Sequence, residues 1–167
     1  MIKIGLLSDT HGSIPDRAVS FFAECDELWH AGDIGNYSVV EKLRKIKPLK
    51  AVYGNIDGGI LRQEFPEVAL FEVEGLRVLM MHIGGYPGRY TQQARPLIEK
   101  YRPGLFISGH SHILKVIFDK KHQLLHINPG AAGNSGFHKN ITMVRFQIEK
   151  GRISDLEVFD KERNREI

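Results

Sequence analysis

Short apolar runs separated by polar and glycine-rich turns dominate the first third of the chain. Ile2–Leu7 is a nearly continuous apolar run, which is typical of a strand buried on both faces. Glu27–His30 and Lys50–Tyr53 are predicted as further strands, whereas Pro15–Glu24 and Val39–Ile46 carry apolar residues at helical spacing. This alternation predicts parallel strands joined by right-handed crossovers, with carboxyl ends that share one edge of a sheet.

The middle of the chain changes this pattern. Leu70–Val73 and Arg77–His82 flank a Glu74–Gly75 turn and predict a β-hairpin. A helix is predicted over Tyr90–Arg102 and a further strand over Gly104–Ser108.

After His112 the chain is rich in strands separated by turns. The predicted strands are Leu114–Phe118, Leu124–Ile127, Thr142–Ile148 and Arg152–Phe159. We expect these strands to form an antiparallel second sheet that packs on the first. Because no linker, internal repeat or low-complexity segment interrupts the sequence, residues 1–167 are predicted to form a single α/β domain.

Composition narrows the class of partner. The formal net charge of +3, from 23 Lys plus Arg against 20 Asp plus Glu, is too small to demand a nucleic-acid partner and mildly favours anionic substrates. The densest basic stretch, residues 42–50, keeps Leu43 and Ile46 at helical spacing, which predicts a solvated helix face. Long polynucleotides are therefore not the expected substrates.

The single cysteine and the N-terminal sequence bear on localisation. Cys25 has no second cysteine with which to form an intramolecular disulfide, so a reducing compartment is the simplest setting. The N-terminal residues lack the features of a signal peptide, and no apolar run approaches the ~18 residues of a membrane span. These features predict a cytoplasmic protein without a membrane partner.

Side chains that can bind metal recur where apolar runs meet glycine or a polar turn. In chain order they are Asp9, His11, Asp33, Asn55, His82, His110 and His112. Residues two apart in extended backbone point to the same face, so one metal ion can take both Asp9 and His11, and His110 and His112 repeat the spacing. Two carboxylates, one amide and four imidazoles suit a pair of divalent ions that share a ligand. A carboxylate has two oxygens, which makes Asp33 the natural bridge.

The alternative interpretation is that these strand-end residues only satisfy turns and helix caps, as Asp and Asn often do. This alternative requires four histidines at such positions by coincidence, although histidine is not a favoured capping residue. The pattern therefore favours a metal site.

Motifs in a fixed order give the chain a resemblance to the calcineurin-like metallophosphoesterases, in particular their small single-domain prokaryotic phosphodiesterases. The motifs are D-T-H at Asp9–His11, G-D at Gly32–Asp33, G-N-x-D at Gly54–Asp57, the strand-end His82, G-H-S-H at Gly109–His112 and N-P-G at Asn128–Gly130. The resemblance spans residues 1–133. It implies an α/β fold, a four-layer αββα sandwich of two mixed sheets flanked by helices.

The resemblance also implies roles for the seven residues. A first ion would be bound by Asp9, His11 and His112 and a second by Asn55, His82 and His110, with Asp33 as the bridge and with Asp33, Asn55 and His82 in catalysis. The ligand types admit Mn²⁺, Fe²⁺, Ni²⁺, Co²⁺ or Zn²⁺, and the resemblance favours two Mn²⁺ ions. The implied enzyme is a metal-dependent phosphodiesterase.

The expected chemistry follows from charge. Two divalent ions carry about +4, and two carboxylates return about −2, which leaves a cationic patch for a small phosphate ester. Metal binding lowers the pKa of water toward ~7, so a hydroxide that bridges the ions is expected to attack phosphorus. Relatives of this size are often dimeric or larger, which leaves a homo-oligomer open.

Two positions depart from the family pattern. Ile56 stands where larger phosphatases of the family carry a histidine proposed to protonate the leaving oxygen, and loss of a general acid costs roughly 10²- to 10⁴-fold. We therefore expect aryl phosphodiesters to be hydrolysed better than alkyl monoesters. Gly84 stands where many relatives carry an additional imidazole. Asp57 either orients a metal ligand or water, or is a turn residue before Gly58, and the sequence leaves both interpretations open.

The other histidines are predicted to lie outside the site. His30, just before Ala31, either supports the metal ligands or is a hydrogen-bonded core histidine at a strand end, and the pattern favours the core role. His126 and His138 are expected to be structural or peripheral, and His122 is expected to be exposed in a turn. The glycine-rich segment 84–90 is either an ordinary loop or a substrate-contacting lid that brings Arg89 to a phosphate.

A different class of function stays open beside the enzyme. The eukaryotic retromer complex contains a subunit with a similar motif set that acts mainly as a scaffold, so a non-catalytic scaffold or protein-binding module is the alternative. Relatives with more domains cut nucleic acids, but this chain shows no evident nucleic-acid platform.

Overall fold

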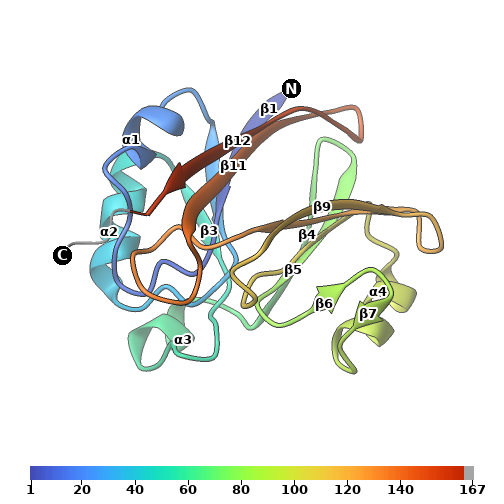
Figure 1. Cartoon of the computed structure of the whole chain (residues 1–167). Coiled ribbons are helices and arrows are strands. Elements are labelled where there is room, and N and C mark those ends of the chain that lie inside the picture. Colours follow the sequence, from blue (N-terminus) through green and yellow to red (C-terminus); the bar gives the residue numbers. More distant parts are fainter. Residues whose placement is uncertain (164–167) are drawn as a thin grey trace.

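Two five-stranded sheets face each other in the computed structural model, which describes residues 1–163 (Figure 1). The strands of the first sheet, in spatial order, are β12 (Arg152–Glu162), β11 (Asn140–Glu149), β1 (Ile2–Leu7), β2 (Glu27–His30) and β3 (Leu49–Ala51). β1, β2 and β3 are parallel, whereas β11 is antiparallel to both β1 and β12. The carboxyl ends of β1, β2 and β3 therefore lie at one edge, as predicted.

The second sheet is also mixed. Its strands, in spatial order, are β4 (Val68–Val73), β5 (Leu76–Met81), β8 (Leu105–Ile107), β10 (Leu124–Pro129) and β9 (Leu114–Asp119). The three central strands are parallel, and β4 and β9 are antiparallel edge strands. A separate small hairpin is formed by β6 (Gly85–Tyr86) and β7 (Arg89–Tyr90).

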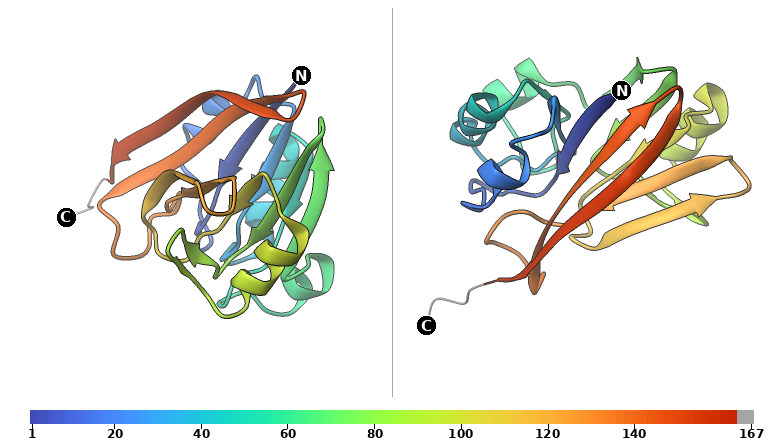
Figure 2. Two further views of the ribbon diagram at one scale, coloured as in Figure 1. Left: turned by 90° about the vertical axis from the view of Figure 1, so that its right-hand side faces the viewer. Right: turned by 90° about the horizontal axis from the view of Figure 1, so that it is seen from above.

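Helices cover the outer faces of both sheets. They are α1 (Ala18–Phe21), α2 (Tyr37–Ile46), α3 (Ile60–Glu64) and α4 (Ala94–Tyr101). α1, α2 and α3 lie on one side of the molecule and α4 lies on the opposite side (Figures 1 and 2). Trp29 and Phe146 belong to the apolar cluster between the sheets, and two further clusters lie under the two helical layers. This four-layer αββα sandwich confirms the predicted fold class.

The prediction that the strands after His112 form one antiparallel sheet was wrong. β9 and β10 join the second sheet, but β11 and β12 extend the first sheet beside β1. β11 is buried on both faces, with Val144 in the cluster between the sheets and Met143 in the cluster under α1 and α2. A strand of this kind needs a place inside a sheet, and its local pattern does not identify which sheet.

Helix bounds differ from the prediction where tertiary contacts intervene. α1 is shorter than the predicted helix over Pro15–Glu24, although Phe22 behind it is fully buried. α4 begins later than predicted because Tyr90 ends β7, where its hydroxyl donates to Asp119 at 2.7 Å. None of the helices within the described residues is long and apolar enough to span a membrane.

Candidate metal centre

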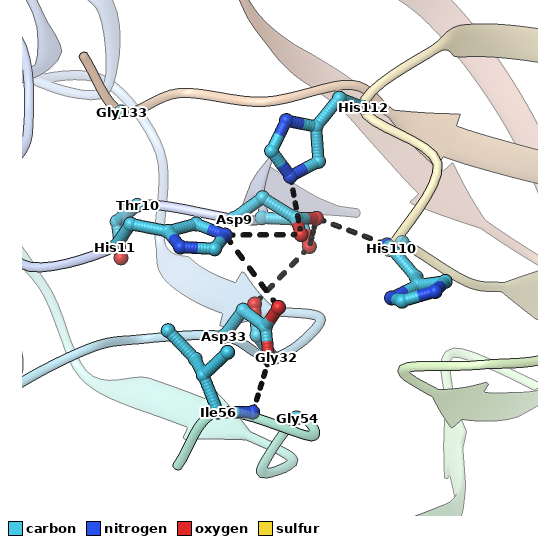
Figure 3. A network of polar contacts seen from close by, with 12 residues as sticks. Asp9, Thr10, His11, Gly32, Asp33, Gly54, Ile56, His110, His112 and Gly133 are labelled. Atoms are coloured by element: carbon cyan, nitrogen blue, oxygen red, sulfur yellow. Dashed lines mark hydrogen bonds and ion pairs between the residues drawn. The ribbon is translucent and has the colours of Figure 1, made fainter. Parts of the chain in front are cut away.

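The seven predicted ligands lie together beside the strand ends that carry them. The loops after β1, β2 and β3 supply Asp9, His11, Asp33 and Asn55, the end of β5 supplies His82, and the loop after β8 supplies His110 and His112. Several of these side chains converge in Figure 3, where the rings of His11 and His112 point toward Asp9. Their ligand atoms fall into two groups that could each hold a metal ion, one built on Asp9 and one on Asp33.

The first group surrounds one oxygen of Asp9. Asp9 Oδ1 lies 3.2 Å from His112 Nε2 and 3.7 Å from His11 Nε2. The other oxygen, Oδ2, accepts hydrogen bonds from Ser8 Oγ at 2.6 Å and from the backbone N–H of His110 at 3.1 Å. Oδ2 thus accepts hydrogen bonds from protein groups, whereas Oδ1 faces the two imidazoles.

The second group is built around His82 and His110. His82 Nδ1 lies 2.8 Å from the carbonyl oxygen of Ala31, which can only accept, so Nδ1 carries the proton and Nε2 presents a lone pair. His110 Nδ1 lies 3.1 Å from Asn55 Oδ1. Two ligands at right angles around one ion, with bonds of about 2.1 Å, lie about 3 Å apart. The separation between Asn55 and His110 therefore suits two ligands of one ion.

Asp33 lies between the two groups. Its Oδ2 is 3.5 Å from His11 Nε2 in the first group and 3.1 Å from His82 Nε2 in the second. Its Oδ1 accepts the backbone N–H of Ile56 at 3.1 Å (Figure 3). The oxygen that stays free faces both groups, which is the geometry that a bridging ligand requires.

Buried polar atoms without hydrogen bonds mark the centre as a cation site. Within the described residues, Asp9 Oδ1, His11 Nε2 and His82 Nε2 are buried and form no hydrogen bond of suitable direction. An unsatisfied buried polar atom costs about 1–3 kcal/mol, and here three such atoms converge. Divalent ions in the two groups would accept lone pairs from these atoms, Asp9 and His11 in the first group and His82 in the second, so the donor set fits the metal ions that its residue types imply.

Charge reinforces this fit. Burial alone would raise the pKa of Asp33, but the His82 ring, whose Nε2 lies 3.1 Å from Asp33 Oδ2, lowers that pKa on balance. Burial alone would also raise the pKa of Asp9, but His112 and His82 lower that pKa on balance. Burial alone would lower the pKa of His82, yet Asp33 and Asp9 raise it. The two carboxylates are therefore anionic at neutral pH, in position to attract a cation.

The backbone of the centre adopts an unfavourable conformation at most ligand positions. Five of the seven have a left-handed φ, namely Asp9 (53°), His11 (46°), Asp33 (56°), His110 (72°) and His112 (62°). A non-glycine residue in this region costs on the order of 1–3 kcal/mol and persists only where surrounding contacts hold it. Gly109 shows how tight these contacts are, because a Cβ there would lie 2.3 Å from Ser8 Oγ.

Asp57 provides several of the contacts that hold these loops. Its carboxylate accepts the backbone N–H groups of Ile34 at 3.1 Å and Gly35 at 2.9 Å, which directly follow Asp33, and of Gly54 at 2.8 Å. Asp57 thus joins the loop of Asp33 to the loop of Asn55. Of the two interpretations left open by the sequence, the structure favours orientation of metal ligands over a simple turn.

The two departures from the family pattern have clear structural consequences. Ile56 is 47% exposed and lines a cavity of about 520 Å³ together with His11, Asp33 and His110, so its side chain offers no proton donor there. At Gly84 a Cβ would lie 2.4 Å from the ring of Phe106. A second imidazole at that position is therefore excluded by packing.

Two of the remaining histidines are structural, as predicted. His30 is fully buried, accepts the backbone N–H of Gly32 and contacts Thr10 Oγ1, both at 3.0 Å, and burial lowers its pKa to about 4. His126 is also fully buried, and its Nδ1 lies 3.1 Å from the carbonyl oxygen of Phe106. Neither ring reaches the ligand groups.

The predictions for the other two histidines need correction. His122 is only partly exposed, because its Nδ1 lies 2.8 Å from Asp119 Oδ2, so a local hydrogen bond replaces the expected solvent exposure. His138 is not peripheral: its Nδ1 lies 3.0 Å from Nδ1 of the predicted ligand His112. Sequence spacing gave no sign of this contact.

The possible lid is an ordered hairpin, formed by β6 and β7. Tyr90 is buried, and the ammonium group of Lys115 lies 3.5 Å from the centroid of the Tyr86 ring. Arg89 lines neither of the two described cavities that contain predicted ligands. The structure therefore gives no support to the interpretation of this segment as a phosphate-binding lid.

Comparison with known proteins agrees with this fold and shows the family. The calcineurin-like phosphoesterase superfamily domain matches residues 2–151. A probable metallophosphoesterase from Methanothermobacter thermautotrophicus is 35% identical over 137 residues, which cover 77% of this chain and 76% of that protein. Fold, site and sequence similarity together define a metallophosphoesterase. The chain belongs to the calcineurin-like phosphoesterase superfamily, whose metallophosphoesterases use divalent metal ions.

Solved structures of low sequence identity show the same fold. An archaeal phosphodiesterase aligns with a TM-score of 0.72 and 22% identity, over 95% of this chain and 100% of that one. Wild-type Vps29 from Entamoeba histolytica, solved in complex with zinc, aligns with a TM-score of 0.75 and 14% identity, over 98% of this chain and 100% of that one. Because these alignments cover almost the whole chain, the similarity of fold includes both sheets.

Proposed function

We propose that this protein is a metal-dependent phosphodiesterase that acts on small phosphate esters. The observation that carries the proposal is the position of Asp33 Oδ2, which faces His11 in one ligand group and His82 in the other. That oxygen suits a bridge between two ions. The archaeal phosphodiesterase of the same fold supports the class of reaction.

The seven residues divide between two ions in this proposal. Asp9, His11 and His112 would hold the first ion, Asn55, His82 and His110 would hold the second, and Asp33 would contribute to both. When bound, two divalent ions neutralise a phosphate and activate water for attack on phosphorus. Ligands without thiolates admit several divalent ions, and we assign Mn²⁺ as the preferred metal by the family resemblance.

The residues of the chain prepare the site for this reaction. Ser8 and the backbone N–H of His110 hold Asp9, and the backbone N–H of Ile56 holds Asp33, so each carboxylate keeps one oxygen directed into the centre. Asp33, Asn55 and His82 are assigned to catalysis by the family resemblance, and each lines a cavity beside the centre: Asp33 one, His82 the other and Asn55 both. Preorganised ligands of this kind need no rearrangement when substrate binds.

The rim of the centre supports a preference for aryl diesters. Ile113 and Phe137 line the same cavity as Ile56 and are 57% and 105% exposed. An aryl group would cover these side chains, and each square ångström of apolar surface removed from water contributes about 25 cal/mol. An aryl oxide also leaves without a proton donor more readily than an alkoxide, which suits a site with isoleucine at position 56.

The test is an activity assay with defined metals. Protein stripped with a chelator receives Mn²⁺, Fe²⁺, Co²⁺, Ni²⁺ or Zn²⁺ in turn, and product release is measured from bis(p-nitrophenyl) phosphate and from p-nitrophenyl phosphate. We expect metal-dependent turnover, with the diester favoured. Asp33→Asn should abolish turnover, whereas Asp16→Asn, an exposed change away from the ligand groups, should retain it. Full activity in Asp33→Asn would refute the proposal.

A scaffold is the second candidate, and the exposed apolar rim is the observation that favours it. Ile113 and Phe137 stand out from the surface beside the metal groups, and exposed apolar patches often mark protein-binding sites. Folded protein that binds metal but hydrolyses neither ester with any of the five ions would favour this candidate over the enzyme.

A further inference from the structure

His138 contacts the predicted ligand His112 on the side of its ring that faces away from Asp9. Its ring and the ring of His112 have centroids 5.0 Å apart, and their Nδ1 atoms are 3.0 Å apart. On the opposite side of the His112 ring, Nε2 lies 3.2 Å from Asp9 Oδ1. His138 therefore touches the ring nitrogen of His112 that does not face the carboxylates.

The hydrogen bonds of His138 fix the position of each proton. His138 Nε2 lies 2.7 Å from the carbonyl oxygen of Gly133, and since a carbonyl only accepts, Nε2 carries a proton. A neutral imidazole has a single N–H, so His138 Nδ1 is an acceptor. The proton in the contact between the two rings then belongs to His112 Nδ1, and His112 Nε2 presents its lone pair toward Asp9.

Further contacts hold the loop of His138 in place. The residue is only 9% exposed, so its ring is packed inside the protein beside His112. The guanidinium group of Arg163 donates to the carbonyl oxygen of Gly136 at 2.9 Å, which places a positive charge near the same loop. Gly133 in turn donates its backbone N–H to the carbonyl oxygen of Asp9 at 3.2 Å, so the loop of His138 is joined to the loop of the first ligand.

The second ligand group offers an internal comparison. There Nδ1 of His82 donates to the carbonyl oxygen of Ala31 at 2.8 Å, which leaves Nε2 free to bind a cation. His112 has the same need but finds a side chain as its acceptor. Such outer hydrogen bonds fix the tautomer and the orientation of a metal-binding histidine.

We propose that His138 is a positioning residue for the first metal ion, which holds His112 as its Nδ1–H tautomer with Nε2 directed at the ion. This inference rests on the proposed role of His112 as a ligand. His138 does not touch substrate in this account, and it acts only through His112.

Two substitutions separate positioning from general structure. In His138→Phe the ring remains but both hydrogen bonds are lost. In His138→Gln the side-chain amide offers an oxygen to His112 and an N–H to Gly133. Lys139→Ala changes an exposed neighbour in the same loop and serves as the matched control.

The first measurement is Mn²⁺ binding to chelator-stripped protein by isothermal titration calorimetry. His138→Phe should weaken binding of one ion by roughly 10- to 100-fold, as for other lost outer hydrogen bonds of metal ligands. His138→Gln should recover most of that loss, and Lys139→Ala should bind like the wild type. Unchanged affinity in folded His138→Phe would overturn the inference, and so would equal losses in the Phe and Gln variants.

The second measurement reads the tautomer directly. In metal-free protein at pH 8, ¹⁵N–¹H correlation spectra of the histidine rings, assigned with a His112 variant, should show His112 protonated at Nδ1. In His138→Phe the Nε2–H form should appear. A wild-type His112 protonated at Nε2 would overturn the inference even if the diesterase activity is present. Wild-type protein that binds no Mn²⁺ would instead overturn the proposed function and the inference together.

Discussion

The left-handed backbone at His112 gives a prediction about folding stability that is independent of catalysis. His112 has a φ of 62°, whereas Asn55, also an exposed or half-exposed loop ligand, is not among the residues with positive φ. His112→Ala and His112→Gly both remove the imidazole, so they differ only in Cβ and in backbone freedom. The same pair of changes at Asn55 provides the matched control.

The magnitude follows from two opposing terms. An L-residue with a Cβ pays roughly 1–2 kcal/mol in the left-handed region, a cost that glycine avoids. Glycine loses about 0.5–1 kcal/mol relative to alanine through its greater freedom in the unfolded chain. The entropic cost of glycine acts at both positions. The free energy of unfolding of the Gly variant minus that of the Ala variant is therefore taken at each position, and the difference between these two values isolates the strain at His112. We expect it to be about 1–2 kcal/mol in favour of glycine at His112.

Thermal and urea unfolding in the presence of a chelator measure these differences. For a chain of this size, 1 kcal/mol corresponds to about 2–4 °C in the unfolding midpoint. Glycine should therefore be favoured at His112, relative to the Asn55 control, by about 2–8 °C. An identical Gly-minus-Ala difference at both positions would refute the strain attributed to the ligand loops.

The remaining predictions concern the leaving group, pH and metal. Ile56→His, in the cavity beside the ligands, should raise kcat/KM for an alkyl monoester such as glycerol 2-phosphate by at least roughly 10-fold, whereas Ile60→His, exposed but outside that cavity, should not; equal effects of the two changes would contradict a proton-donor role. Burial lowers the pKa of His126 to about 4, against about 6.5 in the unfolded chain, so the unfolded state binds more protons between these values and stability falls as pH falls. Between pH 7 and 4.5 the free energy of unfolding, measured with urea, should fall by about 2–3 kcal/mol less in His126→Leu than in the wild type; equal falls in both proteins would contradict this assignment. Mn²⁺ at about 100 times the Kd of each site should stabilise the fold by about 2.7 kcal/mol for each bound ion in calorimetry, and Asp33→Asn should lose most of the total increment; an equal increment in the variant would argue against Asp33 as a ligand.

The sequence predicts the centre well because strand order determines where its residues meet. Parallel strands have carboxyl ends at one edge, so the alternation before Asn55 was sufficient to bring Asp9 and Asp33 together. The order of the later histidines in the chain, together with the family motifs, led to the prediction that His82, His110 and His112 also belong to the centre. The spacing argument for the two pairs assumed extended backbone, but all four residues have a left-handed φ, and His110 and His112 face different ligand groups.

The contacts that support the ligands could not be predicted in the same way. Asp57 accepts N–H groups from a loop 22 and 23 residues away, and His138 contacts His112 across 26 residues. Each depends on the tertiary path of a loop, which has no periodic signal. The sheet to which β11 belongs was predicted wrongly for a related reason: a strand buried on both faces fits the interior of either sheet.

Electron paramagnetic resonance of Mn²⁺-loaded protein tests the central claim most directly. If Asp33 bridges two ions, protein with two equivalents of Mn²⁺ should give the spectrum of an exchange-coupled pair. Asp33→Asn should give only isolated Mn²⁺ or bind fewer ions. Two uncoupled ions in the wild type, or saturation at a single equivalent, would contradict a shared centre built on the oxygen that faces both His11 and His82.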